Sequence, residues 1–167
     1  MELYLLRHGK AQEHATTISG DAKRQLTEAG KKELEVIAKA IKNLEIEVDD
    51  IFSSPLIRAK QTAEIVKKHL KNNKNSIKIW NELKPEIDIK NTIAKLSSLK
   101  PDSSVLLVGH EPHLTSLIAV IISDESSLDI LLKKGGLVHI RCNVVKNTVS
   151  GSLRSIMTPK QLKKLCR

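Results

Sequence analysis

Apolar residues along the chain form short continuous runs that alternate with longer, helically spaced stripes. The clearest run is "SSVLLVGH" at 103–110, whose four consecutive aliphatic residues indicate a buried strand. A second run, "ELYLL" at 2–6, predicts a strand that ends on Arg7, His8 and Gly9. Further strands are predicted within 48–55, at 76–80, at 135–145 and at 150–157.

Helical stripes lie between these runs. In 26–44 apolar residues recur at helical spacing from Leu34 to Ile41, and Thr27 is the expected N-cap. The segment 56–70 carries a similar stripe, and Pro55 stands where its helix is expected to take its first residue. Further helices are predicted at 91–99, at 113–122 and, with Thr158 as the expected cap, at 158–165.

The remaining stretches are polar. Residues 10–25 contain Gly20 and are predicted as a loop, and "NNKN" at 72–75 is typical of a turn. The alternation of strands and helices favours an α/β three-layer sandwich, with a mostly parallel central sheet and helices on both faces. No repeat and no long linker interrupts this order, so residues 1–167 are predicted to form a single domain.

Composition limits the core and the partners. Tyr4, Phe52 and Trp80 are the only aromatic residues, so the core is expected to be aliphatic, and modules that bind nucleic acid by base stacking are disfavoured. The formal net charge is +9, and much of the excess lies in lysine pairs that we interpret as solvated helix faces and ends. No nucleic-acid partner is therefore expected, although a basic surface favours acidic or phosphorylated partners.

The expected location is the cytoplasm. Cys142 and Cys166 lack metal-binding or redox spacing and suit a reducing compartment. Glu2 and Arg7 interrupt the first apolar stretch, so no signal peptide is expected there. The longest apolar run, "LIAVII" at 117–122, is far too short to span a bilayer, and no membrane partner is expected.

The candidate chemistry lies at the ends of the predicted strands. The strand at 2–6 ends on Arg7 and His8, the strand within 48–55 leads to the helix that carries Arg58, and the strand at 103–110 ends on His110. In open α/β sheets, ligands bind beyond the carboxyl ends of the strands. We therefore expect two arginines and two histidines to meet at one edge of the sheet.

Such a group of side chains suits a phosphoryl group. An arginine guanidinium matches phosphate oxygens with paired hydrogen bonds and stays protonated. A neutral imidazole is a competent nucleophile near neutral pH, and fixed cations stabilise the charge that develops on a transferring phosphoryl group. No cluster with metal-ligand spacing is visible, so neither a metal nor another cofactor is expected.

These residues also match a known family. "LLRHG" at 5–9, "SSPLIRAKQTA" at 53–63 and "VGHEPHL" at 108–114 resemble the histidine phosphatase superfamily, which has the phosphoglycerate-mutase-like fold. The motifs "D..R.LT..G" at 21–30 and "TP.QL" at 158–162 are most similar to the SixA-type phosphohistidine phosphatase branch. The resemblance covers nearly the whole chain and implies a metal-independent phosphatase.

The resemblance implies a role for each matching residue. His8 would be the nucleophile that forms a phosphohistidine intermediate, and Arg7 and Arg58 would bind the phosphoryl oxygens. His110 would be a second pocket histidine, hydrogen-bonded to the transferring group. Arg24 would close over the phosphate or the substrate.

The proton donor is less evident from the sequence. Larger members of the superfamily place a glutamate shortly after the third strand, and Glu82 in "WNELKP" stands near that place, with Asp21 and Glu111 as alternatives. A phosphohistidine needs a strong acid less than a phosphoester does, because its imidazole leaves readily. The stretch between Trp80 and Ser103 is also too short for the helical roof of the larger members.

The leading hypothesis is therefore a phosphatase that acts on phosphohistidine in a signalling or phosphotransfer protein. Two alternatives stay open: a phosphatase for small phosphoesters, and a non-catalytic module that binds phosphoproteins. Pure binding would not require a nucleophilic His8, which disfavours the second alternative.

Overall fold

The chain folds around one six-stranded mixed sheet with the order β3-β2-β4-β1-β5-β6. The computed structural model describes residues 1–13, 17–70, 76–123 and 128–166. The first four strands of that order are parallel, and β5 and β6 are antiparallel to their neighbours. The strands are β1 (Glu2–Arg7), β2 (Asp50–Ser53), β3 (Lys78–Ile79), β4 (Ser104–Gly109), β5 (Leu137–Val145) and β6 (Thr148–Met157).

Helices cover both faces of this sheet, as the sequence predicted. Alternate residues of β1 separate the two cores: Leu3 and Leu5 pack in the cluster that includes α4 and α5, and Leu6 packs in the cluster that includes α2, α3 and α6. The helices are α1 (Ile18–Lys23), α2 (Glu28–Asn43), α3 (Ile57–His69), α4 (Ile89–Ser97), α5 (His113–Ser123) and α6 (Pro159–Lys164), with a short 3₁₀ helix at Asn81–Leu83.

The core is mainly aliphatic, as expected from the composition. The largest fully buried side chains are leucines and isoleucines, and one aromatic pair, Phe52 and Trp80, stacks with ring centroids 3.8 Å apart. Among the described residues, no helix combines the length and the apolar character needed to cross a bilayer.

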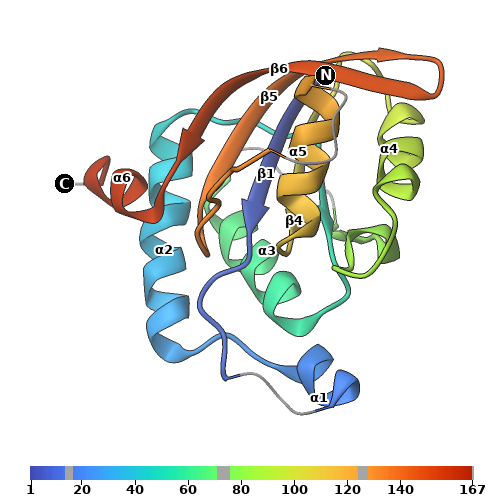
Figure 1. The fold of residues 1–167 in the computed structure, drawn as a ribbon. Helices are drawn as coiled ribbons and strands as arrows, with labels where there is room; N and C mark the ends of the chain where they lie inside the picture. The colour runs from blue at the N-terminus through green and yellow to red at the C-terminus, as the bar shows by residue number, and fades with distance from the viewer. Residues whose placement is uncertain (14–16, 71–75, 124–127, 167) are drawn as a thin grey trace.

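Two predicted caps are confirmed, and one of them positions the loop that follows β1. The Thr27 hydroxyl accepts a hydrogen bond from Gly30 N at 3.0 Å, and Thr158 forms a capping box with Gln161. A Cβ atom at Gly30 would lie 2.2 Å from Lys10 O. Glycine at position 30 therefore lets the first turn of α2 approach the chain just beyond His8 (Figure 1).

The predicted loop at 10–25 is wrong in part, because it contains α1 and a bridge between Ala11 and Leu26. The sequence of α1 is polar and has no apolar stripe. Its fold comes instead from the Thr17 cap and from hydrogen bonds that Asp21 accepts from arginine side chains.

The start of α3 also differs from the prediction. Pro55 precedes the helix rather than opening it, because Leu56 is the N-cap and Ile57 the first helical residue. The predicted strand at 76–80 is reduced to the two residues of β3, which are exposed at the edge of the sheet. The predicted turn at 72–75 lies outside the described residues.

Candidate active site

The carboxyl ends of β1 and β4 place two histidines beside each other. Arg7 pairs with Gly109 in the parallel register, and His8 N donates a hydrogen bond to Gly109 O at 3.0 Å. The rings of His8 and His110 consequently lie with their centroids 4.9 Å apart. Figure 1 shows β1 running toward the end of the molecule at which α1 lies.

Gly135 also holds the backbone around His8 through hydrogen bonds. Its N–H lies 3.0 Å from Arg7 O and 3.2 Å from His8 O. Gly135 has a φ of 78°, a conformation that glycine adopts without strain. Because neighbouring strands and this turn fix the backbone, the His8 ring has a defined position at the sheet edge.

The tautomer of His8 follows from its contact with the Gly9 carbonyl. His8 Nδ1 lies 2.7 Å from Gly9 O, and a carbonyl oxygen can only accept a hydrogen bond. Nδ1 therefore carries the proton. Burial lowers the pKa of His8 to about 3, and the charges of Arg58 and Arg7 act in the same direction. His8 is thus neutral at pH 7, with the lone pair on Nε2.

Arg58 lies in the first turn of α3 and is tied to the chain just beyond β1 through Thr62. The Thr62 hydroxyl donates to Arg58 O at 2.7 Å and accepts from Gly9 N at 3.1 Å. The Arg58 guanidinium is buried and donates through Nη1 to Asp21 O and through Nη2 to Asp21 Oδ2. This network fixes Arg58 relative to His8.

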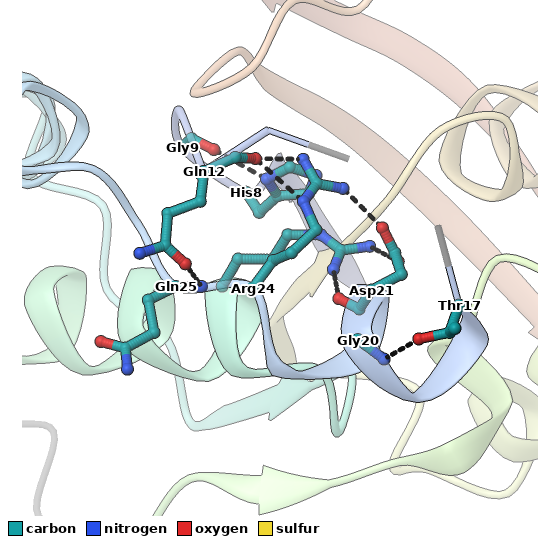
Figure 2. Close-up of polar contacts among 9 residues, drawn as sticks. His8, Gly9, Gln12, Thr17, Gly20, Asp21, Arg24 and Gln25 are labelled. Atoms are coloured by element: carbon teal, nitrogen blue, oxygen red, sulfur yellow. Dashed lines mark hydrogen bonds and ion pairs between the residues drawn. The ribbon is translucent and has the colours of Figure 1, made fainter. Parts of the chain in front are cut away.

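Asp21 bridges two arginines. Arg24 Nη1 donates to Asp21 Oδ1 at 2.6 Å, while Arg24 Nε and Nη2 donate to Gln12 O (Figure 2). Burial alone would raise the pKa of Asp21, but the hydrogen bonds and charges of Arg24 and Arg58 hold it below its usual value. Asp21 is therefore a carboxylate at neutral pH, and Arg24 ties it to the chain beyond β1.

His110 is oriented by Ser54, at the end of β2. His110 Nε2 lies 2.8 Å from Ser54 Oγ, and the Ser54 backbone N donates to Val108 O. Burial and the neighbouring His8 and Arg58 lower the pKa of His110 to about 2. His110, like His8, is therefore neutral near pH 7.

Lys134 and Glu111 complete the polar surroundings of these residues. Burial and the nearby cations, Arg7 first among them, lower the pKa of Lys134. Burial raises the pKa of Glu111, although Thr115 donates to its Oε2 at 2.8 Å. A raised carboxyl pKa favours the protonated form that a general acid requires.

These side chains surround one cavity of about 280 Å³. Four buried polar atoms of its lining residues have no hydrogen-bond partner among the described residues: Arg7 Nε, Arg58 Nε, His110 Nδ1 and Glu111 Oε1. Buried polar atoms are nearly always hydrogen-bonded, so this concentration suits a polar ligand with several acceptors. The described lining residues are Arg7, His8, Asp21, Arg24, Arg58, Pro85, His110, Glu111 and Lys134.

The structure brings together all but one of the residues expected from the sequence. Arg7, His8, Arg58, His110 and Arg24 line the cavity. Glu82 is not among the described lining residues, and its Oε1 lies 3.7 Å from Lys95 Nζ. The 3₁₀ helix that carries Glu82 turns its carboxylate toward α4, so its position gives no support for a role as proton donor.

Two further residues of this site were not expected from the sequence. Lys134 belongs to one of the lysine pairs interpreted above as solvated helix faces and ends, and Ser54 was quoted only within the motif at 53–63. Lys134 precedes β5, which is antiparallel to β1, so the start of β5 lies beside the end of β1.

Among the described residues, no group of three or more His, Cys, Asp or Glu side chains is placed to hold a metal ion.

Comparison with known proteins gives a consistent assignment. Residues 3–91 match the family model of the histidine phosphatase superfamily (branch 1). The chain is 32% identical over 128 residues to phosphohistidine phosphatase SixA of Escherichia coli K12, covering 75% of this chain and 77% of that protein. It is 30% identical over 158 residues to an uncharacterized protein of Picosynechococcus, covering 87% and 88% of the two chains.

The solved structures include a protein histidine phosphatase SixA complexed with tungstate. It superimposes on this chain with a TM-score of 0.84 and 27% sequence identity, over 97% of this chain and 99% of that one. The fold described above is therefore shared with that SixA structure.

Proposed function

The chain belongs to branch 1 of the histidine phosphatase superfamily, and we propose that it removes phosphate from phosphohistidine on a protein, with His8 as the nucleophile. The observation that carries this proposal is the state of His8. Its Nδ1 proton is committed to Gly9 O, its pKa is about 3, and its ring borders a cavity rich in arginine. Nε2 therefore has a lone pair available for attack on phosphorus.

The reaction has two steps. In the first, His8 Nε2 forms a bond to phosphorus, and the bond between phosphorus and the substrate imidazole breaks, with that imidazole taking up a proton. In the second, water attacks the phosphorus held by His8, releasing inorganic phosphate and restoring the neutral ring. Two transfers with one intermediate replace the direct attack of water on the substrate.

Cationic side chains suit the charge of the transferring group. Arg7, Arg58 and Lys134 line the cavity, and the unpartnered Nε atoms of the two arginines supply donors for phosphoryl oxygens. With Nε2 accepting from the Ser54 hydroxyl, His110 would donate from Nδ1, which has no partner among the described residues. The bound tungstate of the SixA relative is an oxyanion of related shape, which supports an oxyanion at this site.

A protein-borne substrate is favoured by the thin cover over the cavity. Of the described residues between Trp80 and Ser104, Pro85 alone contributes to the lining. This stretch therefore contributes little to the wall of the cavity, which suits a phosphorylated side chain carried by another protein. A small substrate would gain less from such a site, because it is less well shielded from water.

One observation favours a second candidate, a phosphatase for small phosphoesters. Glu111 lines the cavity with an unpartnered Oε1, and burial raises its pKa, as expected for an acid that protonates an alkoxide leaving group. The neutral state of His8 suits either substrate. A module that only binds phosphoproteins would have no use for it.

The deciding experiment compares kcat/KM for a phosphohistidine peptide, an aryl phosphate and a sugar phosphate, with phosphate release as the readout. We expect the phosphohistidine peptide to be preferred by about 100-fold or more, because its leaving group needs little acid assistance. Equal turnover of the sugar phosphate would favour the second candidate. Binding of the peptide without any phosphate release would overturn both enzymatic proposals.

A further inference from the structure

A second, larger hollow adjoins the proposed active site. This basic groove has a volume of about 800 Å³ and shares Arg7 and Lys134 with the smaller cavity. Its walls come from the chain after β1, from α2, from the segment before β5 and from α6, which pack together on the α2 side of the sheet. A molecule with a group at His8 can therefore extend directly into the groove.

Its charge is strongly one-sided. The described lining contains six cationic side chains and one carboxylate, Glu33. Glu33 is already paired, with Lys10 Nζ at 3.1 Å and Lys163 Nζ at 2.6 Å. Lys133 and Lys160 are exposed, and within the described part of the chain neither has a carboxylate at ion-pair distance.

Scattered surface lysines are commonplace, but three features set these apart. They are gathered in one concave surface, and that surface continues into the proposed catalytic cavity through Lys134. The positive charges also act on Lys134, because burial and the surrounding cations lower its pKa. Such a region attracts a partner with several negative charges and orients it as it approaches.

The groove also contains an apolar contact point. Leu131 lines it and is 73% exposed, the largest exposed fraction among the large hydrophobic residues described. A leucine in this position loses little by being covered and gains from contact with another apolar side chain. The matching surface would therefore combine carboxylates with at least one apolar residue, rather than carry phosphates alone.

We propose that the basic groove docks an acidic protein surface, with an apolar residue against Leu131, next to the phosphohistidine of the substrate. This inference rests on the proposed function and names the partner class for the same site. The docked surface would be the region of the phosphoprotein that flanks its phosphorylated histidine. Docking there adds affinity outside the cavity and so distinguishes one phosphohistidine protein from another.

The test uses two synthetic phosphohistidine peptides of equal length, one with glutamates around a flanking leucine and one with glutamines in their place. The wild-type protein should show a kcat/KM about tenfold higher for the glutamate peptide, mainly through KM. In the double variant Lys133→Glu/Lys160→Glu this preference should fall to about one or reverse, because the attraction becomes repulsion. Equal kcat/KM for the two peptides in the wild type would overturn the proposal.

A matched control is Lys100→Glu/Lys146→Glu, which changes the net charge equally. Both lysines are exposed and lie at the opposite end of the strands from the proposed active site, where β4 begins and β5 ends. This variant should keep the preference for the glutamate peptide, and an equal loss in it would show a nonspecific charge effect and contradict the docking. Leu131→Ser should raise KM for the glutamate peptide, but this peptide should still be preferred over the glutamine peptide.

Binding without turnover separates this inference from the proposed function. The unphosphorylated glutamate peptide should bind the wild type more tightly than the Lys133→Glu/Lys160→Glu variant, whether or not any phosphate is released. Turnover without this difference would leave the phosphatase proposal standing and overturn the docking proposal. Tight binding of a duplex oligonucleotide at equal ionic strength, lost in the same variant and without discrimination between peptides, would replace the acidic protein with nucleic acid.

Discussion

Asp21 Oδ2 lies 3.0 Å from Arg58 Nη2, and Asp21 O accepts a second hydrogen bond from Arg58 Nη1 at 2.7 Å. The carboxylate and the backbone carbonyl of Asp21 thus occupy the Nη1 and Nη2 edge of the guanidinium, where an oxyanion could otherwise bind. Arg58 Nε has no hydrogen-bond partner among the residues that the structure describes. An incoming phosphoryl group therefore meets an arginine that is held in place and partly neutralised, so Asp21 opposes the binding of anions while it positions Arg58.

The first prediction concerns Asp21→Asn. Removing this negative charge from the cavity wall should tighten the binding of orthovanadate by about threefold to tenfold, because two like charges no longer share one arginine. Titration calorimetry at low and high salt measures the change, which should shrink as salt increases. Asp102→Asn, an exposed residue before β4, removes an equal charge far from the cavity and should leave the affinity unchanged. Weaker vanadate binding in Asp21→Asn would contradict the prediction.

His8→Ala should abolish turnover while leaving the anion site intact. The loss in kcat is expected to be at least about 10³-fold, because the covalent intermediate cannot form. Tungstate should still bind, since Arg7 and Arg58 remain. Because acid hydrolyses phosphohistidine, the reaction should be quenched rapidly without acid. The quenched wild type should then carry bound phosphate, and the variant none. His69→Ala, at the far end of α3 beside Glu35, is the matched control. Full activity in His8→Ala would refute the mechanism.

Arg58→Ala should behave differently from His8→Ala, because it removes charge from the anion site itself. We expect kcat/KM to fall by about 10²-fold or more and tungstate affinity to fall with it. Arg58→Lys should recover little, since an ammonium cannot reproduce the planar guanidinium. Arg154→Ala, on the exposed part of β6, should have no effect on either quantity. Unchanged tungstate binding in Arg58→Ala would show that this side chain does not hold the anion.

The sequence was most informative where local patterns decide the structure. The buried run of β4, the Thr27 and Thr158 caps and the apolar stripe of α3 depend on neighbouring residues and were all predicted correctly. The rule that ligands gather beyond the ends of parallel strands also placed His8 and His110 together.

The sequence was least informative where distant parts of the chain decide. Lys134 reaches the site because β5 runs antiparallel to β1, and strand direction is not encoded in the lysine's neighbours. Helix α1 is held by Arg58 of α3 and by Arg24, its own C-cap residue, rather than by an apolar face. The sequence favoured Glu82 over Glu111, whereas Glu111 lines the cavity, because the path of the chain after Trp80 and after His110 determines which carboxyl faces it.

The stability of the protein should fall as the pH falls below about 6.5, the ordinary pKa of histidine. The pKa of His8 is about 3 and that of His110 about 2 in the folded protein, so between these values and 6.5 the unfolded chain binds more protons. Protonation then favours unfolding, and each histidine should cost about 1–2 kcal/mol between pH 6.5 and pH 5.

Urea unfolding of the wild type, His8→Asn and His110→Asn at several pH values measures this effect. Asparagine does not titrate, so each variant should lose less free energy of unfolding than the wild type between pH 6.5 and pH 5. The comparison of slopes does not require the variants to equal the wild type in stability at pH 7. Parallel curves for all three proteins would show that neither ring resists protonation in the folded state.

The last prediction tests which carboxyl group acts as the proton donor. Glu111 lines the cavity and has a raised pKa, whereas Glu82 lies beside Lys95. Glu111→Gln should lower kcat/KM for a sugar phosphate by about 10²-fold, since its alkoxide leaving group needs a proton, and should affect an aryl phosphate or a phosphohistidine peptide much less. Glu82→Gln, the matched control, should leave all three substrates unchanged. If Glu82→Gln produces the selective loss and Glu111→Gln does not, the donor reaches the cavity from the 3₁₀ helix, and the assignment to Glu111 is wrong.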